Sequence, residues 1–306
     1  MTAHAATVII PVVDRPDELE ACLSEMGGAD VVVVDSSESP EMEAVGRAHG
    51  CKVLKVKAKA PEARNIGASV AGGDVLGFID SDCVPLDGWV ANALRYFDDP
   101  LVGIVTGPTL TPPSQSFRHA IGAKALSTFF GGGIARRRWG ASATHETDER
   151  SVVLANAFVR RDAFVRAGGF TEWFGSEENI LAEKVRRMGL KVVYASDVVV
   201  AHKRVPLVWR FVRQVWYYAR GRGWMVRRHG SSPFYALPTL GLLVALLAPW
   251  LLAVYAFADV VSCALEAASV KEGVALFFVY PLIHLTYAVG FVAGLVARSQ
   301  KEGRQR

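Results

Sequence analysis

The stretch Val75-Leu76-Gly77-Phe78-Ile79-Asp80-Ser81-Asp82 places a short apolar run directly before two carboxylates. The apolar residues 75–79 predict a buried strand. Side chains two residues apart on an extended backbone point the same way, so Asp80 and Asp82 are expected to face one point at the strand end. Hard oxygen ligands of this kind suit Mg²⁺ or Mn²⁺ with a bound phosphate. For an isolated pair, a solvated acidic turn is the alternative.

Strand and helix patterns alternate before this stretch. The predicted strands cover 7–13, 31–34 and 52–56, and the predicted helices cover 17–26, 41–49 and 60–71. Such alternation with short connections predicts a parallel sheet with right-handed crossovers. Ligands bind such sheets at the carboxyl ends of the strands, where Asp14, Asp35 and Asp80 all fall. The topology therefore predicts a ligand site at this edge.

The chain after the carboxylates is less regular. Helices are predicted over 87–97 and 176–188, and strands over 102–106, 152–159, 191–194 and 198–202. The segment 111–151 between them carries the basic run Arg136–Arg138 and is expected to be a mobile functional loop. Its glycines 131–133 are expected to form a flexible hinge, because no Lys-Ser/Thr pair follows them as in a phosphate cradle.

Composition excludes several classes of protein. Lys and Arg exceed Asp and Glu by 34 to 30 over 306 residues, which does not indicate a nucleic-acid partner. The four cysteines make no C-x-x-C pair, so neither a zinc site nor a disulfide framework is predicted. The N-terminal residues lack the basic and apolar regions of a signal peptide.

The last third of the sequence indicates a membrane. Arginines and large aromatic residues mix over 206–229, as expected of a helix at a headgroup interface, or of an amphipathic helix packed on the domain. The runs 231–258 and 273–297 carry no Asp, Glu, Lys or Arg, and ~20 apolar residues cross a bilayer. They predict a transmembrane hairpin with a short exterior loop, and an in-plane or re-entrant hairpin is the alternative because prolines interrupt both runs. Basic residues on either side then place the N-terminal domain and the tail in the cytoplasm.

Several motifs together resemble one family. These are VIIPVVDRPDELEACL, VVVVDSSES, ARNIGASVAGGDVLGFIDSDCVP, and the stretch 156–189 followed by VVVAHK. In this order and spacing, over about 7–203, the chain resembles the family-2 glycosyltransferases with a GT-A fold. The later RQVWYYARGRG is similar to the membrane-associated branch that builds bacterial exopolysaccharide on a lipid carrier, of the succinoglycan glucosyltransferase type.

The resemblance implies a domain plan. A Rossmann-like α/β catalytic domain with a mostly parallel sheet would cover 1–204, an interfacial segment 205–230, and a membrane hairpin with a cytoplasmic tail 231–306. It also implies an inverting, metal-dependent transfer of one sugar from a nucleotide-sugar to a lipid-linked or glycan acceptor, at the cytoplasmic face of a bacterial inner membrane.

The resemblance assigns roles to individual residues. It implies a donor site formed by Pro11, Val13, Asp14, Asp35, Arg64 and Asp80. It implies that Mg²⁺ or Mn²⁺ is held by Asp82, with Asp80 and His202 close to it. Glu178 would be the general base, with Glu177 as the second candidate, although first-turn helix electrostatics explains both residues equally simply. The acceptor and the closing segment would be contacted by Asn156, Gln214 and Arg222.

Departures from the family pattern leave alternatives. Ser36 follows Asp35 where the family has a second acid, and Glu178 stands where it has Asp. The Gln-x-x-Arg-Trp motif of processive synthases is absent, which favours transfer of a single sugar. Three other functions stay open: transfer to polyprenyl phosphate, a nucleotidyltransferase, and a non-catalytic membrane scaffold that binds nucleotide-sugars. A nucleotidyltransferase would carry a Gly-rich loop near the first strand, and PVVDRPDEL is not one.

Overall fold

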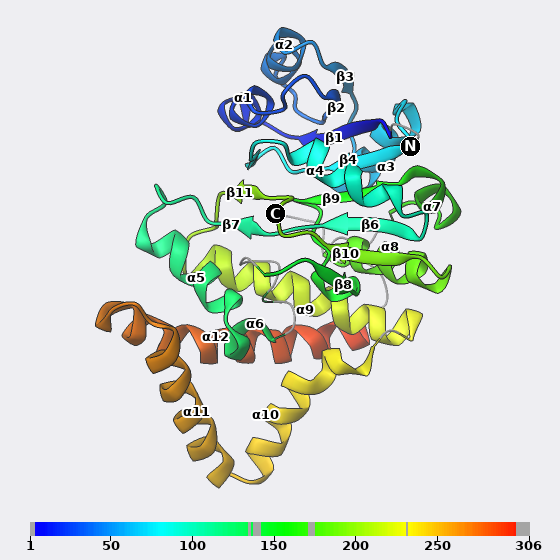
Figure 1. The fold of residues 1–306 in the computed structure, drawn as a ribbon. Coiled ribbons are helices and arrows are strands. Elements are labelled where there is room, and N and C mark those ends of the chain that lie inside the picture. The colour runs from blue at the N-terminus through cyan, green and yellow to red at the C-terminus, as the bar shows by residue number, and fades with distance from the viewer. Residues whose placement is uncertain (1–3, 134–135, 137–141, 171–174, 231, 298–306) are drawn as a thin grey trace. The chain divides into compact units, whose positions relative to one another are not determined.

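A computed structural model describes residues 4–297, except 134–135, 137–141, 171–174 and 231 (Figure 1). The chain divides into two compact units. The first comprises Met1–Pro113, Arg137–Glu172 and Glu177–Lys203, and the second comprises Ser114–Arg136, Trp173–Ser176 and Arg204–Arg306.

The first unit is built on an eight-stranded sheet in the order β3-β2-β1-β4-β9-β6-β10-β8. Its strands are β1 (Ala6–Val12), β2 (Asp30–Asp35), β3 (Lys52–Lys55), β4 (Val75–Phe78), β6 (Val102–Thr106), β8 (His145–Thr147), β9 (Ala157–Arg160) and β10 (Lys191–Tyr194). Strand β1 pairs in parallel with both β2 and β4, so the carboxyl ends of these three strands lie at one edge. Strands β9 and β8 run antiparallel to their neighbours. The predicted α/β fold with a mostly parallel sheet is confirmed.

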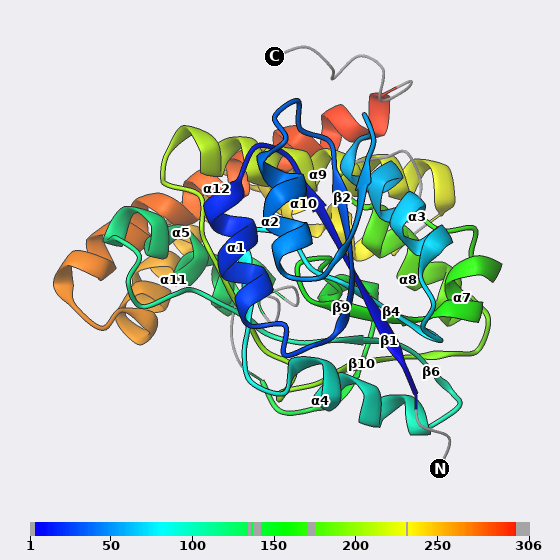
Figure 2. The ribbon, with the colours of Figure 1, turned by 90° about the horizontal axis from the view of Figure 1, so that it is seen from above.

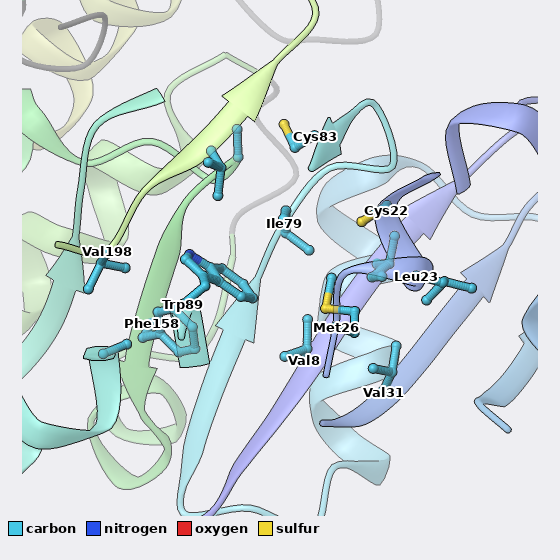
Figure 3. Close-up of a cluster of buried hydrophobic side chains, with 14 of the residues drawn as sticks. Val8, Cys22, Leu23, Met26, Val31, Ile79, Cys83, Trp89, Phe158 and Val198 are labelled. Carbon is cyan, nitrogen blue, oxygen red and sulfur yellow. The ribbon is translucent and has the colours of Figure 1, made fainter. Parts of the chain in front are cut away.

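Helices cover both faces of this sheet (Figure 2). One face packs against α1 (Pro16–Ser24), α2 (Glu41–Ala48) and α4 (Trp89–Arg95), and the other against α3 (Ala60–Val70), α7 (Arg161–Arg166) and α8 (Glu177–Arg187). Figure 3 shows the first core, in which Trp89 lies against Phe158 and the side chains of α1 lie over Val8 and Val31. The unit also contains two single turns of 3-10 helix, η1 (Tyr96–Asp98) and η3 (Glu149–Ser151).

A second, three-stranded sheet extends the carboxyl edge. It consists of β5 (Cys83–Pro85), β11 (Val200–His202) and β7 (Thr109–Leu110), in the order β5-β11-β7. Strands β5 and β11 are antiparallel, with His202 opposite Cys83. This register brings a histidine that is distant in sequence beside the residue that follows Asp82.

The second unit is helical. Its elements are α5 (Phe117–Ser127), α6 (Phe129–Gly132), α9 (Trp209–His229), η4 (Pro233–Ala236), α10 (Leu237–Leu247), α11 (Trp250–Glu266) and α12 (Val270–Val296). Helices α9 and α12 lie side by side in both ribbon views. The buried core of this unit joins Ile121 of α5, Phe211 and Val215 of α9, and Tyr280 and Ile283 of α12.

The predicted loop over 111–151 is wrong, because it contains α5, α6, β8 and η3. Gly131 and Gly132 are close-packed against backbone, so the predicted flexible hinge is wrong for these two, whereas an added methyl group on Gly133 would meet nothing within 4 Å. A methyl group on Gly131 would lie 2.2 Å from the carbonyl oxygen of Ala125, and one on Gly132 would lie 1.9 Å from that of Leu126. Arg137 and Arg138 of the basic run lie outside the described residues.

The first apolar run is not one crossing helix. It is divided into η4, α10 and α11, with Ala248 and Pro249 between the last two. Ala248 leaves helical geometry with φ −128° and ψ 79°, as expected before a proline. Among the described residues, α12 is the one helix long and apolar enough to cross a membrane. The predicted cytoplasmic tail, from Arg298 onward, lies outside the described residues.

Candidate active site

The two aspartates of the opening stretch lie on a turn and not on an extended strand. Strand β4 ends at Phe78, and the backbone N–H of Cys83 donates to the carbonyl oxygen of Asp80 over 3.0 Å. The chain bends here because it leaves the main sheet and enters β5 of the small sheet. The extended backbone expected for Asp80 and Asp82 is therefore wrong, and each carboxylate has its own partners.

Asp80 is paired with Arg64 of α3. The Arg64 Nη2 atom donates to Asp80 Oδ1 over 2.5 Å, and its Nη1 atom lies 3.6 Å from Glu177 Oε1. Arg64 is only 5% exposed. Its Nε and Nη1 atoms are buried and have no hydrogen-bond partner among the residues that the structure describes. The guanidinium thus keeps donor capacity at the edge of the site.

Asp82 lies with His202 and Cys83. Its Oδ1 atom is 3.5 Å from His202 Nε2 and 3.7 Å from Cys83 Sγ, and the three ligand atoms all lie within 4.8 Å of one another. Arg15 donates to Asp82 Oδ2 over 3.2 Å and to Glu18 over 2.9 Å. The Asp82 carboxylate and the His202 imidazole fit a divalent metal such as Mn²⁺, whereas a thiol like that of Cys83 favours softer ions.

Burial raises the pKa of Asp82 above its ordinary value, and the neighbouring Asp80 charge adds to the rise, although His202 and Arg15 oppose it. A cation bound at this position would relieve the repulsion between the two carboxylates. The electrostatics therefore agree with the donor set.

The ends of β1 and β2 form the neighbouring part of the edge. Asp14 is exposed and adopts a left-handed backbone with φ 49°, which Asp tolerates better than most residues, and its N–H donates to Ser37 Oγ over 2.8 Å. Val13 is 51% exposed, and Pro11 is half-buried. Asp35 differs from these residues because it is fully buried: its carboxylate accepts from Lys55 Nζ and from the Ser37 N–H, each over 2.8 Å.

The two glutamates begin α8, as predicted. Glu177 is 3% and Glu178 is 7% exposed, so both are buried carboxylates in the first turn of the helix. Glu177 lies beside Arg64, whereas Glu178 is the next residue along the turn.

Asn156 is fully buried and its side chain is engaged within the first unit. Its amide accepts from Trp89 Nε1 over 2.8 Å and donates to the carbonyl oxygens of Pro108 and Val198 over 3.1 and 2.7 Å. This geometry ties the residue before β9 to the segments that lead into β7 and β11 of the small sheet. The bonds explain why an asparagine occupies the interior of this core.

The remaining two predicted residues belong to the second unit. Gln214 is half-buried on α9. The Arg222 guanidinium carbon lies 5.5 Å from the ring centroid of Tyr235 and 5.8 Å from that of Tyr287, so cation–π contacts hold it between two aromatic rings. Arg222 therefore links α9, η4 and α12.

The sequence did not single out three residues that the fold adds to the site. These are Arg15, Lys55 and Cys83. Lys55 is the last residue of β3, which pairs in parallel with β2, so Lys55 lies opposite Asp35. The predicted order of the parallel strands was the signal that could have pointed to Lys55. Arg15 follows Asp14 directly. Cys83 depends on the β5–β11 pairing, which local pattern does not reveal.

A doubly wound sheet with carboxylates at its carboxyl edge defines a nucleotide-binding class of α/β protein. Residues 7–159 match the model of glycosyl transferase family 2, and the chain belongs to that family.

The relatives cover different shares of the chain. The chain is 30% identical over 203 residues to the pre-mycofactocin glycosyltransferase of Mycobacterium tuberculosis, a match that covers 64% of this chain and 42% of that protein. It is 23% identical over 260 residues to glycosyltransferase AglE of Haloferax volcanii, covering 77% and 79%. The chain thus spans less than half the length of the mycobacterial relative.

One solved structure is similar over nearly the whole chain. The mannosyltransferase PcManGT from Pyrobaculum calidifontis, in complex with GDP-mannose and Mn²⁺, aligns with a TM-score of 0.62 and 20% identity. The alignment covers 98% of this chain and 89% of that one. At this identity the likeness establishes the GT-A fold.

Proposed function

We propose that the protein transfers a single sugar from a nucleotide-sugar, most simply a UDP-sugar, to a lipid-linked or glycan acceptor, with inversion at the anomeric carbon. Family membership and the carboxylates at the edge of the sheet support this reaction class. The membrane would lie beside the second unit, and the reaction would occur at the cytoplasmic face of a bacterial inner membrane.

The proposal rests on the buried Arg64 guanidinium, two of whose nitrogens have no hydrogen-bond partner among the described residues. A buried guanidinium with two donor nitrogens left without hydrogen bonds is costly unless an anion completes it. Asp80 holds one side of it over 2.5 Å, which fixes its orientation. The diphosphate of a nucleotide-sugar is the anion that fits a planar fork of N–H donors. Arg64 would therefore orient the donor's leaving group.

The metal would be held by Asp82 and His202, with Cys83 within reach. A divalent cation there supplies Lewis-acid stabilisation of the charge that develops on the diphosphate. The similar mannosyltransferase structure contains Mn²⁺, which supports this choice of cofactor. Asp80 would contribute through its pairing with Arg64, close to the ribose and diphosphate.

Glu178 is the proposed general base. In a direct displacement, the acceptor hydroxyl oxygen forms a bond to the anomeric carbon as the bond from that carbon to the diphosphate oxygen breaks. The hydroxyl proton passes to the Glu178 carboxylate, and the nucleoside diphosphate leaves with the bonding electrons. Glu178 is buried in the first turn of α8. General-base assistance is worth roughly 10²–10⁴-fold.

The donor's nucleoside would lie along Pro11, Val13 and Asp14, where the chain becomes exposed just after β1. Asp35 would act from beneath this surface through Lys55 and Ser37. Gln214 and Arg222 would act with the acceptor or the closing segment, and Asn156 would hold the strand ends in place through its buried bonds.

A second candidate is transfer to polyprenyl phosphate. Its acceptor oxygen is already ionised, so it needs less help from Glu178. The apolar second unit supports both candidates equally. A non-catalytic scaffold that binds nucleotide-sugars would keep the Arg64 site and lack turnover.

The test is a screen of UDP-, GDP- and dTDP-sugars with purified protein in lipid, with Mn²⁺ or Mg²⁺ present or chelated. Release of the nucleoside diphosphate that requires a metal and a lipid extract supports the proposal. Replacing the extract by polyprenyl phosphate or by a polyprenyl-diphosphate-sugar separates the two acceptors. Donor binding without turnover under every condition would favour the scaffold.

A further inference from the structure

We infer that helices α10 and α11 enter a single leaflet of a lipid bilayer as a re-entrant hairpin, while α9 and α12 lie along its surface, so that no helix of the second unit crosses the membrane. This deepens the membrane part of the proposed function. It does not depend on which sugar is transferred, and the experiment below reads topology separately from turnover.

Helix α12 is locked along α9. A methyl group on Gly294 would lie 2.1 Å from the carbonyl oxygen of Arg220, and one on Gly223 would lie 2.1 Å from that of Phe291. Such backbone proximity is typical of small residues spaced four apart on packed helices, here Gly290 and Gly294. The two helices therefore behave as one body.

The ends of the pair are fixed as well. Arg227 Nη1, near the end of α9, donates to the carbonyl oxygen of Leu295 over 2.7 Å, and its Nη2 atom donates to that of Ala297. These bonds satisfy carbonyls at the end of α12 that have no partner within the helix. The two helices are thus joined along their lengths and at their carboxyl ends.

Helix α9 cannot cross a bilayer. It carries six arginines in 21 residues: Arg210, Arg213, Arg220, Arg222, Arg227 and Arg228. Each arginine at the bilayer centre costs ~2.5–3.5 kcal/mol on insertion scales. Because α12 is bound along α9, a crossing α12 would bring these arginines into the hydrocarbon. Both helices therefore lie in the plane of the surface, although α12 alone is long enough to span.

The free face of α12 fits this orientation. Its exposed apolar side chains recur every three or four residues, which places them on one side of the helix. They are Val270, Val274, Phe277, Phe278, Leu285, Val289, Val292 and Val296. The opposite side is buried against α9 and in the core that includes α5. One apolar stripe on a helix packed against protein is suited to lie on the acyl boundary.

The start of α12 also stays on the side of the catalytic unit. Lys124 Nζ of α5 donates to Glu272 Oε2 over 2.6 Å. Helix α5 follows the first unit after a few residues and carries Arg118, His119 and Lys124, so it does not cross the membrane. The loop before α12 must therefore lie on the same side as α5, and the exterior loop of a two-span hairpin is not compatible with this ion pair.

The arms of the hairpin have the length of one leaflet. Helix α10 has 11 residues, and α11 has nine before its first charged residue, Asp259. At 1.5 Å per residue the arms reach about 14–16 Å, against about 15 Å for half of a ~30 Å hydrocarbon core. Arg227 and Arg228 precede the hairpin and Lys271 follows it, which suits anionic headgroups at its base.

Lipid fits the tip of the hairpin better than a second protein does. Leu247 is 87% exposed, and Trp250 and Phe257 are also largely exposed. From Leu240 to Phe257, only Ala245 is buried, so exposure surrounds the arms and is not confined to one face. A protein partner covers a face, whereas acyl chains surround an inserted segment.

The test is cysteine labelling in membrane vesicles of both orientations, with a membrane-impermeant maleimide. In a Cys51→Ser background, single variants place a cysteine at the tip (Leu247→Cys), between the apolar runs (Glu266→Cys) and on the first unit (Glu62→Cys); Cys22, Cys83 and Cys263 are buried. The inference predicts that Glu266→Cys and Glu62→Cys are labelled in the same vesicles. Leu247→Cys is expected to lose labelling in both kinds of vesicle and to regain it in detergent.

Two results would overturn the inference. Labelling of Glu266→Cys and Glu62→Cys in vesicles of opposite orientation would show a hairpin that crosses. Labelling of Leu247→Cys without detergent would show that the tip lies in water. Turnover assayed on the same vesicles reports separately on the proposed reaction, so either proposal can fail while the other stands.

Discussion

Arg64 Nη2 lies 2.5 Å from Asp80 Oδ1, so one buried guanidinium fixes the first aspartate of the turn after β4. The same side chain reaches to 3.6 Å from Glu177, at the start of α8. Helix α3, the turn after β4 and the start of α8 thus meet at one guanidinium group. The two aspartates have different partners: Asp80 is paired with Arg64, whereas Asp82 lies 3.5 Å from His202.

Replacement of Arg64 is expected to weaken nucleotide binding. Arg64→Met removes charged hydrogen bonds worth ~1.5–3 kcal/mol, and UDP should bind about 10- to 100-fold more weakly. Isothermal titration with UDP measures this, and Arg64→Lys, which keeps the charge without the fork, should fall between. Arg47→Met, which removes an exposed arginine paired with Glu43, is the matched control. Equal affinity for UDP in Arg64→Met and wild type would remove Arg64 from the donor site.

Asp82→Asn is expected to abolish metal binding. The substitution keeps the shape of the side chain but removes the charge that His202 and Cys83 cannot replace. Electron paramagnetic resonance of added Mn²⁺ should show free ion in the variant at concentrations where the wild type binds it. Metal-dependent turnover should be lost in parallel. Asp87→Asn, exposed five residues further along, should bind as the wild type does; unchanged Mn²⁺ binding in Asp82→Asn would place the metal elsewhere.

The two glutamates of α8 are expected to fail in different ways. Glu178→Gln should lower kcat by roughly 10²–10⁴-fold with little effect on donor binding, because only proton transfer is lost. Glu177→Gln should mainly raise the KM for the donor, because Glu177 lies beside Arg64. Steady-state kinetics with the donor varied separates the two. A Glu178→Gln enzyme with wild-type kcat would exclude that residue as the base.

Several strands of the first unit could be predicted from the sequence, because each is a short continuous run of apolar residues. Residues 102–106 form β6 as predicted, and the continuous apolar run 31–34 lies within β2. Asp35 ends β2, and Asp14 and Asp80 follow β1 and β4. Because these three strands are parallel, the topology alone places the three aspartates at the carboxyl edge of the sheet. What failed was the local geometry at Asp80–Cys83, which depends on pairing between β5 and β11.

Errors in the second unit have a different origin. The sequence pattern does not predict α5, because its four buried residues pack against partners distant in sequence such as Phe211 and Tyr280. Hydropathy described the run 231–258 correctly as apolar, but it does not register the break at Ala248 and Pro249. His284, within the second apolar run, hydrogen-bonds to Tyr255 and to the carbonyl oxygen of Phe130, each over 2.8 Å.

Asp148 is expected to make stability depend on pH in the acid range. Burial raises the pKa of this carboxyl, but hydrogen bonds from Arg150 outweigh burial and hold the pKa below its ordinary value. A depressed folded-state pKa stabilises the protein above the unfolded value of ~3.9, and the contribution is lost as the pH falls through the folded-state pKa. The difference in melting temperature between wild type and Asp148→Asn should therefore shrink as the pH falls below about 4. A difference that stays constant as the pH falls through this range would contradict the assignment.

A methyl group at the α9–α12 contact should cost stability. Gly294→Ala would place a carbon 2.1 Å from the carbonyl oxygen of Arg220, and because both partners are backbone, the helices must separate. Such overpacking costs ~1–3 kcal/mol, so the apparent melting temperature in detergent should fall. Gly241→Ala on α10 is the matched control, since a methyl group there meets nothing within 4 Å and gains helix propensity of roughly 0.5–1 kcal/mol. Equal melting temperatures for both variants would show that α9 and α12 are not interlocked, and would remove the reason for keeping α12 in the plane of the membrane.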